Sequence, residues 1–398
     1  MKRLSEFLFV ALTAILCCSC SQGVRVRYVS EESRIQDFSN LKLQVFMESS
    51  GSMNGYLCAG SQLKDAVYGY VGALAAIVDT VELNYINSKV IPYGDDLKFF
   101  VRDLTSQHLR SVSGNTGHSD IASMFEAILN RTDENTVSIF VSDCILDVPE
   151  GEASNYYVNR SLDIKNAFQS KIRKEKDLSV IVLRLESVFD GWYFYAKGKE
   201  YLKKEKRPYF MFVIGGKDAL AYLNRNVSIQ EIPHGVANYF ALTSGGIVPF
   251  QITNRSGVSM GNTCECRPDR DGFYRILLKA DLSSALQETG ALCQLDRYRL
   301  RYRTTVLEEV VPLQDEASGY THLMQIAISP NAKSCAERLA LHAEMLPVWL
   351  DAVHDDSGKD IRSHLDETTG IKYIIEGVAG AYDGVDVLAT MDFVVENH

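Results

Sequence analysis

The chain has 398 residues, and its 51 acidic and 41 basic side chains give it a formal net charge of −10 at pH 7. Proteins that bind nucleic acids generally need a basic surface to release counterions from phosphates, so this acidic balance argues against that function. Apolar residues make up 46% of the chain and only nine residues are proline, which is an ordinary globular composition. The length predicts two domains.

The N-terminus has a short basic start followed by an apolar run over residues 7–16, which is too short to span a bilayer. The sequence Cys-Cys-Ser-Cys follows shortly after. This pattern resembles a bacterial lipoprotein signal, in which a small residue precedes the cysteine that becomes lipidated. We therefore predict a signal peptide over residues 1–19, lipidation of Cys20 and a polar tether over residues 20–37. Lipidation of Cys18 is one alternative, and an uncleaved membrane anchor is another.

A cysteine that carries more than one acyl chain anchors a protein stably to a membrane. The N-terminal pattern therefore predicts a protein of the bacterial cell envelope, held on the outer membrane or the periplasmic face and otherwise soluble. No later segment approaches eighteen uninterrupted apolar residues, so no membrane-spanning helix is predicted beyond the N-terminus.

Residues 38–228 contain apolar runs that alternate with helical patterns. Predicted strands cover residues 41–47, 81–86, 90–93, 137–142, 178–185 and 209–214. Predicted helices cover residues 63–78, a segment that begins at Ser119, and residues 162–175 and 217–224. Continuous apolar runs are typical of strands buried on both faces. Their alternation with helices predicts an α/β fold with a doubly wound, mostly parallel sheet.

Residues 229–398 change in character. Predicted strands cover residues 247–252, 274–280, 298–306, 322–329, 338–346 and 385–395, and one helix is predicted over residues 368–382. Several of these strands alternate apolar and polar residues with period two, which is typical of an antiparallel sheet with one face in water. We therefore predict a β-rich second domain over residues 229–398.

Oxygen-bearing side chains follow two predicted strands of the first domain. Glu48, Ser50 and Ser52 come at the end of one strand, and Asp143 comes directly after another. Ser119 begins a predicted helix on the same rim. Ligands of open α/β sheets bind at the carboxyl ends of the strands, and carboxylates with hydroxyls suit hard cations such as Mg²⁺. These five residues therefore predict a divalent cation site.

The three segments resemble the von Willebrand factor type A domain and its metal-ion-dependent adhesion site, which uses an Asp-x-Ser-x-Ser turn, a distant threonine and a distant aspartate. Ser50 and Ser52 fall on the two serines, which coordinate the metal directly. Ser119 falls on the threonine position, and Asp143 on the last aspartate, which usually holds the metal through water. Glu48 departs from the first aspartate by one methylene, so it touches the ion directly, displaces a water or weakens the site.

The resemblance implies a binding module rather than an enzyme. Such a module would hold Mg²⁺, with Mn²⁺ and Ca²⁺ as alternatives, and would receive an acidic side chain from a partner protein. The sequence contains no Gly-x-Ser-x-Gly or His-Glu-x-x-His motif. Two alternatives stay open: an envelope scaffold that uses the same fold without metal, and a metal-dependent hydrolase with His118 as its general base.

Two other segments allow more than one interpretation. The aromatic and lysine-rich stretch over residues 186–208 either grips a glycan, a lipid headgroup or a protein, or forms a two-stranded ribbon that packs its aromatic side chains on the neighbouring domain. Cys264 and Cys266 are too close in sequence for an easy mutual bond. We therefore expect plain thiols or one disulfide to Cys293 or Cys335, with a Cys-x-Cys zinc site as the alternative.

Overall fold

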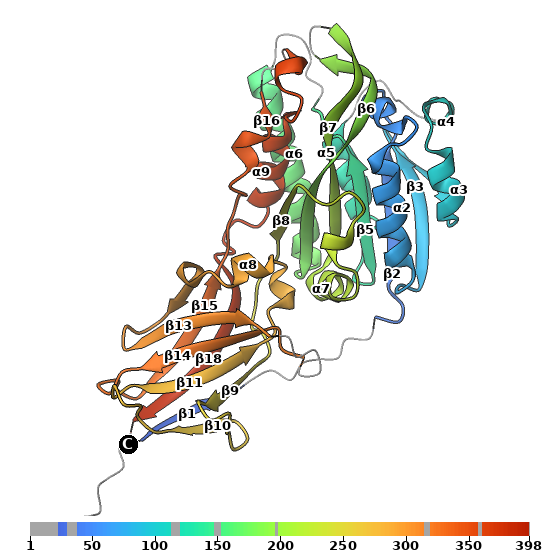
Figure 1. The fold of residues 1–398 in the computed structure, drawn as a ribbon. Helices are drawn as coiled ribbons and strands as arrows, with labels where there is room; N and C mark the ends of the chain where they lie inside the picture. The colour runs from blue at the N-terminus through green and yellow to red at the C-terminus, as the bar shows by residue number, and fades with distance from the viewer. Residues whose placement is uncertain are drawn as a thin grey trace, which may run out of the picture.

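The protein is described by a computed structural model that covers residues 23–29, 38–112, 120–146, 153–195, 198–313, 319–356 and 360–397. Figure 1 shows two lobes, a larger one with helices on both sides of a sheet and a smaller one built of strands. The predicted signal peptide and Cys20 lie outside the described residues. Among the residues described, no helix has both the length and the apolar character needed to cross a bilayer.

The larger lobe contains one seven-stranded sheet. Its strands run in the order β4 (Val90–Gly94), β3 (Thr80–Ile86), β2 (Lys42–Glu48), β5 (Thr136–Ser142), β7 (Gly198–Gly216), β6 (Leu178–Tyr195) and β8 (Asn238–Leu242). Only the β2–β3 and β2–β5 pairs are parallel, and the other four neighbouring pairs are antiparallel. The predicted doubly wound, mostly parallel sheet is therefore wrong.

The error has a physical cause. Both faces of this sheet are covered, so its strands are continuous apolar runs whichever way they point. The runs at residues 178–185 and 209–214 are the inner halves of β6 and β7, which form one long antiparallel hairpin closed at the pair Tyr195↔Gly198. No helix separates them, so they cannot form a parallel crossover. The outer half of this hairpin is the predicted ribbon at residues 186–208.

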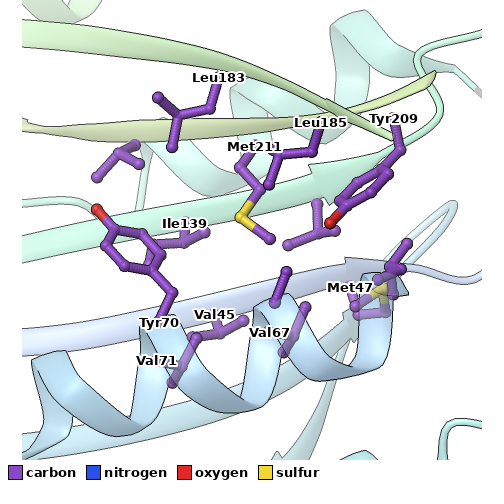
Figure 2. Close-up of a cluster of buried hydrophobic side chains, with 14 of the residues drawn as sticks. Val45, Met47, Val67, Tyr70, Val71, Ile139, Leu183, Leu185, Tyr209 and Met211 are labelled. Atoms are coloured by element: carbon purple, nitrogen blue, oxygen red, sulfur yellow. The ribbon is translucent and has the colours of Figure 1, made fainter. Parts of the chain in front are cut away.

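Helices cover both faces of the large sheet. One face is covered by α2 (Gln62–Ala75), α3 (Leu97–Asp103), α4 (Ser106–Ser111) and α7 (Lys217–Asn226), and the other by α5 (Ile121–Leu129), α6 (Ala153–Lys174) and α9 (Ile371–Gly380). An apolar core lies on each face of the sheet, and alternate residues of β2 pack into one or the other. Val45 packs on the α2 side and Phe46 on the α5 side. Figure 2 shows Val67 and Val71 of α2 next to Val45 of the sheet in the first of these cores.

The smaller lobe is a sandwich of two antiparallel sheets. One sheet has the order β10 (Thr263–Cys266), β1 (Val24–Tyr28), β18 (Val387–Asn397), β15 (Cys335–His342) and β12 (Tyr298–Leu300). The other has the order β13 (Thr305–Pro312), β14 (His322–Ile328), β11 (Tyr274–Ala280) and β9 (Phe250–Asn254). The short helix α8 (Thr289–Leu292) lies at the end of this lobe that faces the larger one (Figure 1). A separate apolar core fills the space between the two sheets.

The predicted boundaries at residues 37 and 228 differ from this arrangement. Residues 24–28 of the predicted tether form β1, which inserts between β10 and β18 of the sandwich. In the opposite direction, β8 is the edge strand of the large sheet, and α9 packs in the core formed by α5 and α6. Both lobes are therefore assembled from segments that are distant in sequence. Pairings of this kind leave no local signal in composition or periodicity.

Gly377 tests the docking of α9 on α6. A Cβ added at this position would sit 2.6 Å from the carbonyl oxygen of Ser161 in α6. We expect Gly377→Ala to lower the free energy of unfolding by ~1–3 kcal/mol, because overpacking outweighs the better helix propensity of alanine. Urea denaturation measures the difference. Gly290→Ala is the matched control, since a Cβ there meets nothing within 4 Å. Equal midpoints for the two variants would contradict the docking of α9 at this glycine.

Candidate functional site

The ends of two parallel strands bring the first site residues together. The β2–β5 register pairs Met47 with Val141, so the next residues along each strand, Glu48 and Ser142, lie side by side. The hydroxyl of Ser142 donates a hydrogen bond to Oε2 of Glu48. Glu48 and Ser142 are both fully buried. The sequence pattern predicts Glu48 as a site residue but not Ser142, although a serine at the end of an apolar strand is a usable signal.

The turn after β2 supplies two hydroxyls. The backbone N–H of Ser49 donates to the carbonyl of Ile86 over 2.8 Å, which extends the pairing of β2 with β3 by one residue. The chain then enters a 3₁₀ helix over Ser52–Leu57. The Oγ atoms of Ser50 and Ser52 lie 3.0 Å apart. Ser50 is buried, whereas Ser52 is half-buried.

Asp143 follows β5 directly and is 1% exposed. Its Oδ1 accepts the backbone N–H of Ile145 at 3.3 Å, while its Oδ2 is buried and accepts no hydrogen bond from the part of the chain that the structure describes. Burial, and then the negative charge of Glu48, raise the pKa of Asp143 to about 7. The nearby hydroxyl of Ser52 and the guanidinium of Arg207 act in the opposite direction but are outweighed.

Four of the five predicted ligands therefore converge: Glu48, Ser50, Ser52 and Asp143. Ser119, the fifth, lies outside the described residues, as does His118. The structure describes no group of three or more His, Cys, Asp or Glu side chains that could hold a metal ion. A cation at this site would therefore take two carboxylates and complete its oxygen ligands with hydroxyls and water.

Arg207 is a site residue that sequence analysis missed. It lies on β7 and is 1% exposed. Its Nη1 donates to the backbone carbonyls of His364, Leu365 and Glu367 at 3.0, 2.9 and 3.0 Å. Its guanidinium carbon lies 4.7 Å from the ring centroid of Tyr193. Arg207 ends a lysine-rich run whose other members are mostly exposed, so composition alone suggested a solvated residue.

The same C-terminal segment covers the end of β5. The backbone N–H of Leu146 donates to the carbonyl of Thr369 at 3.0 Å, and the hydroxyls of Thr369 and Tyr193 lie 3.3 Å apart. Gly370 has a φ of +82° and packs on Leu146, so closely that an added Cβ would lie 2.7 Å from the Leu146 Cβ. The two carboxylates are therefore enclosed, and Ser52 is the member of the set nearest to solvent.

The residues present fit a hard divalent cation. All the donor atoms are oxygens, and Oδ2 of Asp143 is buried without a hydrogen bond from any described residue. Two carboxyl groups in an apolar surrounding repel each other when both are ionised. Glu48, Asp143, Ser50 and Ser52 would hold such an ion, and its charge would offset the repulsion between the carboxylates.

No protein-family model matches the chain, and no curated protein matches it. Among solved structures, the chain is similar to the pilus adhesin SpaC from Lactobacillus rhamnosus GG in its open conformation, at 8% sequence identity and a TM-score of 0.21. The match covers 75% of this chain and 59% of the adhesin chain, so this protein spans less than two thirds of that adhesin's length. A TM-score this low does not indicate a common fold.

Asp143→Asn tests the electrostatics of the site. Because the pKa of Asp143 is raised to about 7 from an ordinary value of 3.8, its contribution to stability is complete below pH 3.8 and is lost as the pH rises through about 7. In chelator, we expect Asp143→Asn to be more stable than the wild type at pH 8, by ~1–3 kcal/mol, and this difference to be smaller at pH 5 and to vanish only below pH 3.8. Thermal unfolding at both pH values measures this.

The exposed Asp296 provides the control, because Asp296→Asn should change stability little at either pH. A wild type that is as stable as Asp143→Asn at pH 8 would show that Asp143 ionises without cost.

Added metal should reverse the order of stability of the wild type and Asp143→Asn at pH 8. We expect millimolar Mg²⁺ or Mn²⁺ to raise the melting temperature of the wild type at pH 8 and not that of Asp143→Asn, since saturation at 100 times Kd adds about 2.7 kcal/mol. Glu48→Asp should bind metal more weakly, because the shorter side chain gives up the hydrogen bond from Ser142. Tighter binding by Glu48→Asp would show that the longer side chain compromises the site.

Proposed function

We propose that the protein is a lipid-anchored binding module of the bacterial cell envelope that recognises a partner protein through a divalent cation. The observation that carries the proposal is the convergence of Glu48 and Asp143, with the hydroxyls of Ser50 and Ser52, at the carboxyl edge of β2 and β5. Serine hydroxyls are neutral and leave positive charge on the ion. An acidic side chain of the partner would offset that charge as the last ligand.

The proposed anchor is a lipidated Cys20, as the N-terminal pattern predicts. Val24, four residues later, begins β1 in the sandwich. An anchored chain would therefore hold the sandwich near the membrane and present the larger lobe farther out (Figure 1). Mass spectrometry of the mature N-terminus checks the anchor, and an unmodified N-terminus would remove it from the proposal.

Access to the site sets a requirement on binding. Glu48 and Asp143 are 0% and 1% exposed, so a partner carboxylate must approach past Ser52 or displace the segment that Arg207 holds. The proposed binding therefore includes a local opening at residues 364–370. This requirement predicts slow association for a protein whose interface must open first.

The test is capture of partner proteins from envelope extracts by the immobilised full chain. We expect a set of proteins retained in Mg²⁺ and released by chelator. The Asp143→Asn variant should not retain them, whereas the surface control Asp296→Asn should. Identical retention with and without chelator, by the wild type and Asp143→Asn alike, would contradict a metal-dependent function.

A second function, a metal-independent envelope scaffold, is favoured by one observation. The buried guanidinium of Arg207 opposes the rise in the pKa of Asp143 and thus supplies part of the positive charge that an ion would supply. In that case Mg²⁺ would leave the melting temperature unchanged. Arg207→Met would then unfold or strongly destabilise the protein, because it removes the buried charge and the hydrogen bonds that Arg207 donates to three backbone carbonyls.

A further inference from the structure

Two thiols lie side by side in the sandwich core. Cys264 and Cys266 are on β10, and their side chains point inward and are 1% and 3% exposed. Glu265 between them is exposed, as the alternation of a strand requires. The two Sγ atoms are 3.6 Å apart. The sequence predicts plain thiols or one disulfide to Cys293 or Cys335. The structure agrees with the plain thiols and not with that disulfide, since each of the four cysteines is free and Cys264 faces Cys266.

The backbone geometry permits a bond between these thiols, under strain. Residues two apart on a strand have Cα atoms about 6.6 Å apart. Disulfides span Cα separations of about 4.4–6.8 Å, so a bond at the upper end must draw the two residues together and bend the strand. A strained disulfide is more easily reduced than a relaxed one.

β10 is placed to accept such a bend. It has four residues and lies at the edge of its sheet, where β1 is the neighbouring strand and Thr263 also forms a single bridge with Met260. A turn with Gly261 in the left-handed region, φ +57°, precedes it, and Pro268 follows it. An edge strand of this length loses few ladder hydrogen bonds when it bends. The thiols also differ chemically, because the S–H of Cys266 lowers the pKa of Cys264.

We propose that Cys264 and Cys266 form a reversible, redox-active disulfide within a single strand. The reaction partner is a disulfide-bearing oxidant of low molecular weight or of a protein. The Cys264 thiolate attacks one sulfur of the oxidant and releases one thiolate, which leaves a mixed disulfide. Cys266 then loses its proton and attacks Sγ of Cys264, releasing the second thiolate. The two cysteines lose two electrons and two protons, and the oxidant gains them as two thiols.

The experiment equilibrates the full chain in mixtures of reduced and oxidised glutathione, quenches it with acid, alkylates it in denaturant and digests it with trypsin. Trypsin cuts after Arg255 and Arg270 but not between Arg267 and Pro268, so residues 256–270 form one peptide that contains both cysteines. Cys293 and Cys335 fall on separate peptides. A bond between Cys264 and Cys266 therefore appears as one unalkylated peptide. Its mass is lower by two hydrogen atoms than that of the same peptide with two free thiols.

We expect this lighter peptide in oxidising mixtures, and its full return to the doubly alkylated form in excess reduced glutathione. In Cys266→Ser, the peptide should stop as a mixed disulfide of Cys264 with glutathione. Cys293→Ser is the matched control and should behave as the wild type. If either serine variant misfolds, the wild-type peptide alone decides the question.

Three results would overturn the proposal. One is a doubly alkylated peptide at every glutathione ratio. Another is a disulfide that joins residues 256–270 to the peptide of Cys293 or Cys335. The third is protection from alkylation that a chelator removes without any loss of hydrogen, which would indicate a bound soft metal instead.

Discussion

Parallel pairing of β2 with β5 is the constraint on which the functional end of the larger lobe depends. It places Glu48 beside Ser142 and therefore brings Asp143 within the field of Glu48, inside an apolar surrounding. Two buried carboxyl groups cannot both ionise there without a compensating charge. Protonation of Asp143, the nearby guanidinium of Arg207 and a bound cation are three ways to supply that compensation. The chemistry of the site follows from which of them dominates at a given pH and metal concentration.

The antiparallel β6–β7 hairpin is part of the same arrangement. It carries Arg207 on β7 and Tyr193 on β6, and Arg207 is held by three carbonyl oxygens of the C-terminal segment. That segment then continues into α9, which fills the core beside α5 and α6. The C-terminal part of the chain therefore closes the site that the N-terminal strands begin. A guanidinium with several fixed acceptors is well suited to such a closure, because it cannot lose its charge and its donors are rigidly placed.

The sandwich carries separate chemistry at its own edge. β10 lies at the end of the molecule away from the larger lobe, as Figure 1 shows. Its paired thiols share no residue with the carboxylate site. β1, which begins four residues after Cys20, is the strand that pairs with β10, at Val26↔Cys264 and Val24↔Cys266. Bending of β10 would therefore first distort its pairing with β1, the strand nearest the proposed anchor.

The amino-acid sequence by itself determined the local elements and the positions of the polar groups at their ends. The strand before Glu48, the strand before Asp143 and the helix α9 could be predicted because apolar periodicity and turn residues act over a few positions. Four of the five predicted ligands lie together for the same reason, since adjacent parallel strands end at one edge.

Only the tertiary structure decided which strands pair and in which direction. A strand buried on both faces has the same apolar run whether its neighbour is parallel or antiparallel. The strand order β5–β7–β6 and its antiparallel direction therefore could not be predicted from the sequence. Ser142 and Arg207 acquire their roles from partners across the sheet and from residues more than 150 positions away. The insertion of residues 24–28 into the sandwich and of α9 into the other lobe likewise depends on long-range contacts. Such contacts are set by the burial of whole faces, not by the residues adjacent in sequence.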